Sequence, residues 1–141
     1  MSWLPKKCVV VPFDFWEQSG QALETAREFV DNGANLHVVH VLSEIIAGEP
    51  GIYWETIDND ARRYHAERAF HDSFASSPFN QSHFHVRFGD PGREIAGLAE
   101  QLNAELIVMP SHGRSGLTRL LIGSVAERVL RLAHCPVLIL K

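Results

Sequence analysis

Cysteine is scarce in this sequence, with only Cys8 and Cys135 among 141 residues. The two do not form a CxxC pair, and each lies beside an apolar run among valine, proline or lysine. We therefore expect two small buried thiols in a reducing compartment, with a redox pair as the alternative.

Long apolar runs are also missing. The N-terminal segment MSWLPKKCVVVPFD holds an apolar stretch far too short for a signal peptide or a membrane span, and no other stretch approaches membrane length. There is no excess of positive charge either: 13 Lys and Arg against 17 Asp and Glu give a formal net charge of −4. This balance argues against non-specific binding to nucleic acid or to an anionic membrane. We expect a cytoplasmic protein that binds neither nucleic acid nor membrane. A small local anion site is still compatible with the net negative charge.

What is present is the composition of an ordinary globular domain, with 45% hydrophobic and 21% charged residues. A chain of this length can bury a core without disulfides or metals. No internal repeat or low-complexity tract divides it. We therefore expect a single domain over residues 1–141.

Apolar runs and amphipathic segments alternate along the chain. Strands are predicted at 8–12, 36–42, 83–88, 105–109 and 135–140, and helices at 19–30, 56–75, from Pro91 through Leu102, and from Ser124 to about Ala133. Strands that alternate with helices imply parallel pairing through right-handed crossovers. The pattern predicts an α/β fold: one doubly wound domain with a five-stranded parallel sheet and four flanking helices. Residues 43–55 are predicted to form a loop, the only plausible mobile segment.

Small and flexible residues gather in MPSHGRSGLTRLLIGSVAERVL, residues 109–130, at one strand-to-helix junction. In an open α/β sheet, ligands bind at the carboxyl ends of the strands. The first strand ends at Pro12, Phe13 and Asp14, and the fourth runs into this stretch. If the two strands are neighbours, their loops face one crevice.

The stretch has features of an anion site. Gly113 can adopt a positive φ and let backbone N–H groups approach a ligand. Ser124 is predicted to cap the next helix, with Glu127 completing a capping box. The first N–H groups of that helix favour a phosphate, and Arg114 could add charge. The alternative is that these are turn and cap residues with no ligand.

Several catalytic and metal motifs are absent. No Lys precedes Ser124, so the stretch is not a P-loop, and no GxGxxG opens the first helix. Ser111 lies in MPSHG rather than in the GxSxG of a nucleophile elbow, which argues against a hydrolase triad. His83 and His85 form an H-x-H pair on a predicted strand, a possible two-ligand metal grip. Because no Cys or carboxylate lies at a matching spacing, we favour surface or capped histidines and predict no metal site.

The sequence resembles the universal stress protein family over its whole length. The resemblance rests on the Pro12-x-Asp14 strand end, the His40-Val41 pair, the turn at 89–91, the ELIVM strand, and SHGRSGLTRLLIGSVAERVL followed by CPVLIL. Nucleotide-binding members of that family carry Gly-x2-Gly-x9-Gly-Ser/Thr. Here Gly113, nine residues and Gly123-Ser124 reproduce the second half, and Pro110 replaces the first glycine. Proline has no N–H, so any ligand bond from that position is lost, while the other contacts do not depend on it.

The resemblance implies a sheet order of 3-2-1-4-5 and an adenine nucleotide, ATP or AMP with optional Mg²⁺, at the carboxyl ends of strands one and four. It also implies a homodimer through strand 137–140 and a stress-response regulator or sensor rather than a turnover enzyme. The alternatives are a nucleotide-free homodimeric interaction module and a slow ATPase. The residues implied in binding are Pro12, Phe13, Asp14, Val41, Met109, Ser111, His112, Gly113, Arg114, Gly123, Ser124 and Val125.

Overall fold

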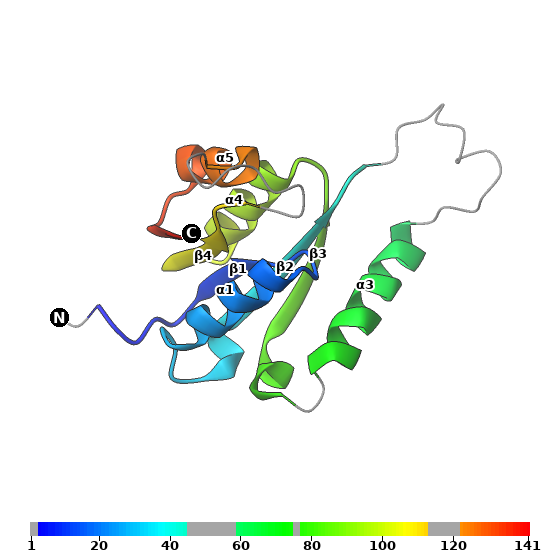
Figure 1. Ribbon diagram of the computed structural model, residues 1–141, viewed down its shortest axis with the longest axis horizontal. Helices are drawn as coiled ribbons and strands as arrows, with labels where there is room; N and C mark the ends of the chain where they lie inside the picture. Colours follow the sequence, from blue (N-terminus) through cyan, green and yellow to red (C-terminus); the bar gives the residue numbers. More distant parts are fainter. Residues whose placement is uncertain (1–2, 45–58, 75–76, 113–121) are drawn as a thin grey trace.

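The computed structural model describes residues 3–44, 59–74, 77–112 and 122–141. Its centre is a parallel sheet in the order β3-β2-β1-β4-β5 (Figure 1). The strands are β1 (Val9–Pro12), β2 (Leu36–Leu42), β3 (His83–Phe88), β4 (Leu106–Pro110) and β5 (Val137–Leu140). The helices are α1 (Glu17–Arg27), α3 (Asn59–Phe74), α4 (Pro91–Gln101) and α5 (Ser124–Leu132), with short 3-10 turns at η1 (Gly33–Asn35) and η2 (Pro78–Gln81). The predicted fold class and strand order are confirmed.

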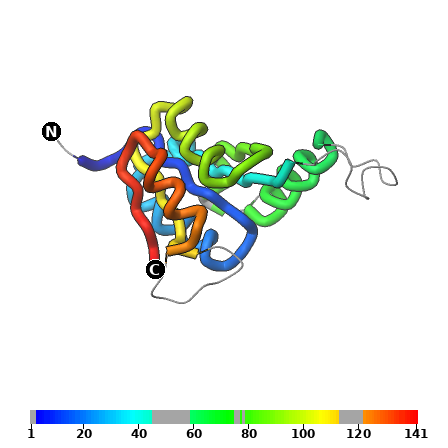
Figure 2. Tube along the Cα trace, turned by 90° about the horizontal axis from the view of Figure 1, so that it is seen from above, coloured from blue at the N-terminus to red at the C-terminus, as the bar shows by residue number. Residues whose placement is uncertain are grey.

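The sheet is buried on both faces, as expected for parallel strands whose crossovers are helical. Val9, Val10 and Val11 of β1 are all fully buried, because alternate side chains point to opposite faces. On one face Val9 and Val11 pack with Leu23 of α1 in a core rich in phenylalanine. On the other face Val10 packs with residues of α4 and α5. The two ends of the sheet are far apart, with α3 at one and α5 at the other (Figures 1 and 2).

Several local predictions need correction. Helix α1 begins at Glu17 and ends at Arg27, rather than running from 19 to 30. The capping box at Ser124 is wrong: the N-cap of α5 is Gly123, and it makes no side-chain cap hydrogen bond. The Glu127 carboxylate instead accepts a hydrogen bond from Arg131 at 2.6 Å. Most of the predicted 43–55 loop, and the predicted start of the second helix, lie outside the described residues.

The thiols are less buried than expected. Cys8 and Cys135 are both free and only half-buried. Burial raises the pKa of both thiols, and the charges of Glu105 and Cys135 raise the pKa of Cys8 further. Both positions lie where the strands begin, at the rim of the sheet, which explains their partial exposure. Within the described residues, no helix has the length and apolar character needed to cross a membrane.

Candidate functional site

A cavity of about 510 Å³ opens at the carboxyl ends of β1, β2 and β4, beside the first turns of α4 and α5. Its size lies within the range of small-molecule sites. The neighbouring positions of β1 and β4 in the sheet create it, because both strands end at the same edge. The crevice expected from the sequence is therefore present.

Ten of the twelve residues implied in binding line this cavity: Pro12, Phe13, Asp14, Val41, Met109, Ser111, His112, Gly123, Ser124 and Val125. Gly113 and Arg114 lie outside the described residues. The cavity is completed by residues that the predicted set did not include: Ser19, Val39, His40, Pro91, Ile95, Pro110 and Ala126. Geometry brings the predicted residues together, and their role in binding stays a prediction.

Asp14, which lines the cavity, is held in place by a local turn. Its Oδ1 atom accepts hydrogen bonds from the Trp16 N–H at 3.0 Å and from the Ser19 hydroxyl at 2.8 Å. Ser19 is buried, and its oxygen also lies 2.8 Å from the Trp16 carbonyl. Asp14 is not the N-cap of α1, because that position is Trp16. The carboxylate is therefore held by residues at the start of α1, although Asp14 does not cap that helix.

The residue after Asp14 has an unusual backbone conformation. Phe15 has a φ of 66°, in the left-handed region that bulky residues rarely adopt. Its ring packs edge-on against Phe13 and His40, with centroids 4.9 and 5.0 Å away. His40 in turn places Nδ1 2.8 Å from the Phe13 carbonyl, and since a carbonyl only accepts, Nδ1 carries the proton. Aromatic packing thus stabilises the strained turn that presents Asp14.

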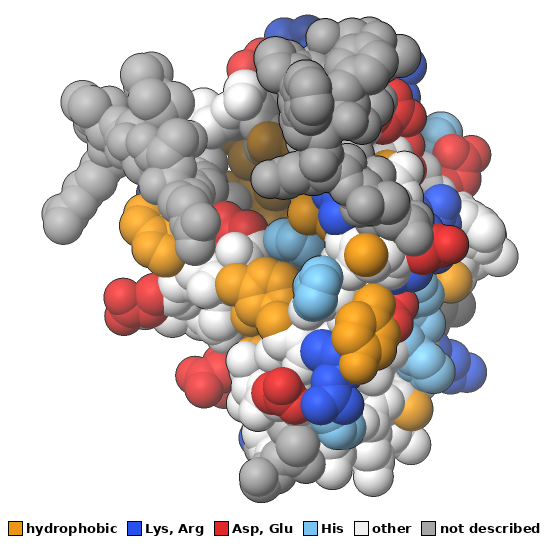
Figure 3. All heavy atoms as spheres, turned by 90° about the vertical axis from the view of Figure 1, so that its right-hand side faces the viewer, with side chains coloured by type: hydrophobic (Ala, Val, Ile, Leu, Met, Phe, Trp, Pro, Cys, Tyr) orange, Lys and Arg blue, Asp and Glu red, His pale blue; other side chains and the backbone are white. Residues whose placement is uncertain are grey.

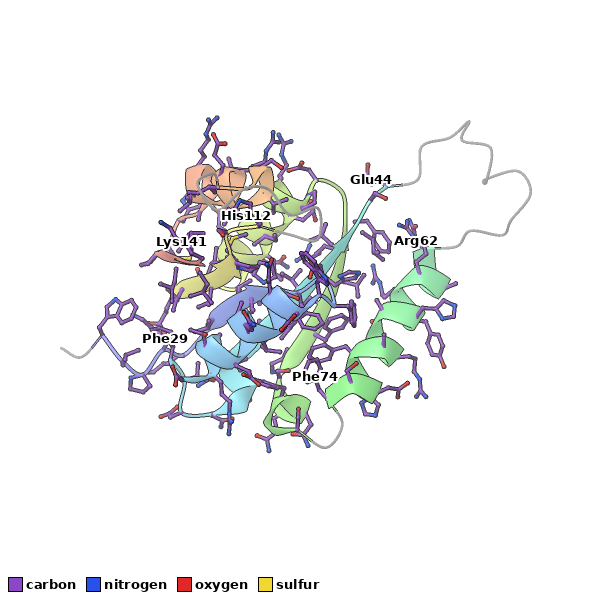
Figure 4. The ribbon with its side chains drawn as sticks, in the orientation of Figure 1. Phe29, Glu44, Arg62, Phe74, His112 and Lys141 are labelled. Atoms are coloured by element: carbon purple, nitrogen blue, oxygen red, sulfur yellow. The ribbon has the colours of Figure 1, made fainter. Side chains whose placement is uncertain are left out.

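Ser111 and His112 follow the end of β4, and Ser111 is hydrogen-bonded to the residue that caps α5. The Ser111 N–H donates to the Leu140 carbonyl, and the Gly123 N–H donates to the Ser111 carbonyl, both at 2.8 Å. A Cβ at position 123 would lie 2.9 Å from that carbonyl oxygen, so close packing requires glycine here. His112 Nδ1 lies 3.0 Å from the Ser111 hydroxyl. In Figure 4 His112 lies between β4 and α5.

His112 carries the clearest sign of a missing partner. Its Nε2 atom is buried and has no hydrogen-bond partner in the part of the chain that the structure describes. Buried polar atoms in native proteins are nearly always satisfied, and an exception calls for a ligand or an ordered water. Because His112 lines the cavity, a polar ligand there could supply the missing bond.

The N-terminus of α5 faces the same cavity. The first intrahelical bond at this end runs from the Glu127 N–H to the Gly123 carbonyl at 3.0 Å. The N–H groups of Ser124, Val125 and Ala126 therefore precede the helix ladder and carry the positive end of its dipole. All three residues line the cavity. This end of the cavity is suited to a phosphate.

The remaining walls are mainly apolar. Val39, Val41 and Met109 lie on the face of the sheet that α4 covers, and Ile95 of α4 packs against them. These apolar side chains suit a flat apolar ring. Asp14 is the only carboxylate among the described lining residues, and none of them is Lys or Arg. In the described residues no three His, Cys, Asp or Glu side chains are grouped to hold a metal ion. Mg²⁺ would therefore need the ligand's phosphates and water beside Asp14.

Comparisons with known proteins identify the family. Residues 6–141 match the sequence profile described as the Universal stress protein family. The chain is 34% identical over 140 residues to universal stress protein MJ0531 of Methanocaldococcus jannaschii, covering 96% of this chain and 82% of that one. The chain belongs to the universal stress protein family.

Solved structures agree with the fold. The structure of MJ0577, described as a test case for assigning biochemical function from structure, is 27% identical, with a TM-score of 0.72, 98% of this chain covered and 97% of that one. A universal stress protein solved in complex with cAMP is 21% identical, with a TM-score of 0.65 and coverage of 97% and 98%. At the latter identity the likeness shows the fold alone.

Proposed function

We propose that this universal stress protein binds an adenine nucleotide, ATP or AMP, in the cavity at the carboxyl ends of β1 and β4. The observation that carries the proposal is the pairing of two chemistries in one cavity. An apolar wall of Val39, Val41 and Met109 suits a base, and the free N–H groups of α5 suit phosphates. The buried Nε2 of His112 supplies a further polar atom without a partner. The protein of this fold that was solved with cAMP supports an adenosine phosphate as the first ligand to test.

Asp14 and His112 have different roles in this proposal. The Asp14 carboxylate, fixed by Ser19 and Trp16, would bind a ribose hydroxyl or share Mg²⁺ with the phosphates. His112 would donate to or accept from the ribose or phosphate through Nε2. When bound, Mg²⁺ would neutralise phosphate charge, and no described Lys or Arg in the cavity does so.

Pro110 distinguishes this site from the family's nucleotide-binding pattern. It is the last residue of β4 and lines the cavity itself, so the ligand meets a ring and no N–H at this position. We expect weaker binding than with glycine here. Pro110→Gly should tighten nucleotide binding, and calorimetry on both proteins measures the difference.

The output of the site is proposed to be a nucleotide-dependent conformation or partner contact in a stress response. Asp14 and His112 are the candidate bases that the sequence analysis favours for a slow ATPase. Phosphate release above background that disappears in Asp14→Asn and His112→Asn would favour the ATPase. Release at background in protein saturated with ATP would favour the regulator. A cytoplasmic location stays a prediction from the sequence.

The deciding experiment is a calorimetric titration of nucleotide-free protein with ATP and Mg²⁺, and then with AMP. Gly123 is a poor choice for mutation, because a Cβ there would contact the Ser111 carbonyl at 2.9 Å. Ser124→Asp is a better choice, because Ser124 is exposed at the start of α5. The helix dipole stabilises a carboxylate at this position, so the fold is retained, whereas the carboxylate repels a bound phosphate. Ser124→Asn is the neutral control of similar shape.

We expect about one site per chain in the wild type, little change in Ser124→Asn and at least tenfold weaker binding in Ser124→Asp. Absence of binding in folded, nucleotide-free wild type would refute the proposal. Equal affinity in the Asp and Asn variants would show that phosphate does not lie at α5.

A homodimer through β5 is the second proposal, and it holds with or without nucleotide. β5 lies at the edge of the sheet, and all four of its residues are only half-buried. Leu130 and Leu132 of α5, a helix that contacts β5, are exposed. An apolar edge strand tends to pair with another strand. The carbonyls of Pro136 and Leu140 accept hydrogen bonds from Ile107 and Ser111, on the β4 side of β5. Because successive residues of a strand direct their backbone groups to opposite sides, the N–H of Ile139 points away from β4.

The dimer is tested by measuring molar mass with light scattering after size exclusion. Ile139→Pro removes the outward N–H without removing a bond to β4, and Ile139→Val keeps it. We expect dimers for the wild type and Ile139→Val and monomers for Ile139→Pro. A monomeric wild type would refute the dimer. A stable dimer that binds no nucleotide would identify the protein as an interaction module.

A further inference from the structure

A cluster of three histidines lies outside the cavity, on strands β2 and β3. His37, His83 and His85 share one face of the sheet, since they occupy alternate positions in register: His37 pairs with His83, and Val39 pairs with His85. This is the face that α4 covers, because Val39, which alternates with His37, packs with α4. Figure 3 shows the side of the molecule where α3 and β3 lie, with several histidine side chains at its surface. The H-x-H pattern alone did not indicate His37, which is 48 residues from His85 in the sequence.

The three rings are close to one another. Nδ1 of His37 and Nε2 of His85 are 2.9 Å apart, a hydrogen bond in which one nitrogen donates and the other accepts. The rings of His37 and His83 are stacked, with centroids 4.7 Å apart and an interplanar angle of 14°. His83 is exposed, whereas His37 and His85 are half-buried.

The pair has the chemistry of a metal ligand set. Neutral imidazole is the commonest protein metal ligand. Burial lowers the pKa of His37 to about 4 and also lowers the pKa of His85, so both rings are neutral at neutral pH. Nδ1 of His37 and Nε2 of His85 are near enough for rotation of the two rings to turn both lone pairs toward one metal ion. Imidazole suits Cu²⁺, Ni²⁺ and Zn²⁺, and for a given nitrogen site the affinity is highest for Cu²⁺.

We propose that His37 and His85 form a surface site for a divalent transition metal of the Cu²⁺ or Ni²⁺ type. Water completes the coordination, and His83 lies beside the metal. On binding, both rings turn about their Cβ–Cγ bonds, and the donating ring moves its proton to its other nitrogen. Two metal–nitrogen bonds replace one N–H···N bond, and no proton is released.

Two features limit the strength of this site. No three metal-ligating side chains already converge among the described residues, so the protein supplies a bidentate pair. The positive charge of Arg87 acts on His85, and Arg87 donates a hydrogen bond to Gln101 of α4. We therefore expect micromolar rather than nanomolar affinity. The site is independent of the nucleotide cavity.

The test uses the full chain without an affinity tag, titrated with Cu²⁺ at pH 7.5 in the absence of nucleotide. His37→Asn and His85→Gln place an amide near the ring nitrogen that is lost, so each can keep the hydrogen bond but not the imidazole ligand. His71→Gln, at an exposed position of α3, is the matched control. Electron paramagnetic resonance counts the nitrogens bound to copper.

We expect one Cu²⁺ with two coupled nitrogens in the wild type and in His71→Gln. His37→Asn and His85→Gln should each bind at least tenfold more weakly, with little change in melting temperature without metal. No saturable binding, or equal affinity in all four proteins, would overturn the proposal. If a variant fails to fold, NMR of the wild type decides. Substoichiometric Cu²⁺ should broaden the ring signals of His37 and His85 first, and broadening of His71 or His134 first would overturn the proposal.

Discussion

Gly92→Ala is the most informative stability test that the fold offers. Gly92 lies in the first turn of α4, where that helix contacts α5. A Cβ at this position would lie 2.6 Å from Cβ, 2.7 Å from Cγ and 2.9 Å from Cδ of Arg128. A different rotamer of Arg128 could move Cγ and Cδ away. It could not move Cβ, which is fixed to the backbone of α5, so the two helices must separate.

The magnitude follows from two opposing effects. Overpacking of this kind costs about 1–3 kcal/mol. Replacing glycine with alanine in a helix contributes about 0.5–1 kcal/mol of stability in return. The steric effect is larger, so we expect Gly92→Ala to lower the free energy of unfolding by about 1 kcal/mol. Pro91 and Ile95 line the cavity on either side of Gly92, so the nucleotide affinity proposed for this cavity should fall as well.

Gly97→Ala is the matched control. It lies in the same helix, and a Cβ there would meet no atom within 4 Å outside the helix backbone. It should raise the free energy of unfolding by about 0.5–1 kcal/mol. Urea unfolding followed by far-UV circular dichroism measures both variants. If Gly92→Ala is as stable as Gly97→Ala, close contact between α4 and α5 at Gly92 does not exist and the packing described above is wrong.

Three further predictions concern other parts of the molecule. Ser19→Ala removes a buried hydroxyl that donates to Asp14, and it should cost about 1–2 kcal/mol in urea unfolding. The pKa of His37 is lowered from 6.5 to about 4, so the folded state resists protonation that the unfolded state accepts. With a chelator present, stability should therefore be full above pH 6.5 and fall as pH drops toward 4. Burial raises the pKa of Cys8 and Cys135, so both should react with an aromatic disulfide reagent much more slowly at pH 8 than in denatured protein.

Each of these predictions has a control. Ser73→Ala removes an exposed hydroxyl of α3 and should change stability by less than about 0.5 kcal/mol. His37→Asn should flatten the fall in stability between pH 6.5 and 4, and an unchanged profile would show that His37 is not the group responsible. Thiol labelling as fast in folded as in denatured protein would contradict the partial burial of Cys8 and Cys135 and the raised pKa of both thiols.

The sequence by itself determined the order of the elements and the edge of the sheet at which the cavity lies. Continuous runs such as CVVVP are typical of strands buried on both faces, and Val9, Val10 and Val11 are fully buried. Helical connections between such strands require parallel pairing, which puts every carboxyl end at one edge. Local signals therefore placed Asp14 at the same edge of the sheet as Ser111 and Gly123, and the adjacency of β1 and β4 brings them to one crevice.

Tertiary structure alone decided which contacts these residues make. Gly92 and Gly97 have the same local sequence character, and only the approach of α5 makes one of them sterically necessary. Ser124 is a good cap by composition, yet Gly123 is the N-cap: its backbone is extended and its carbonyl accepts the first bond of α5 from the Glu127 N–H. The Gly123 N–H is held by the Ser111 carbonyl at the end of β4. His37 joins His85 only through the register of β2 and β3. Strand register and helix packing are set by contacts between distant parts of the chain, and the local periodicity of the sequence does not predict those contacts.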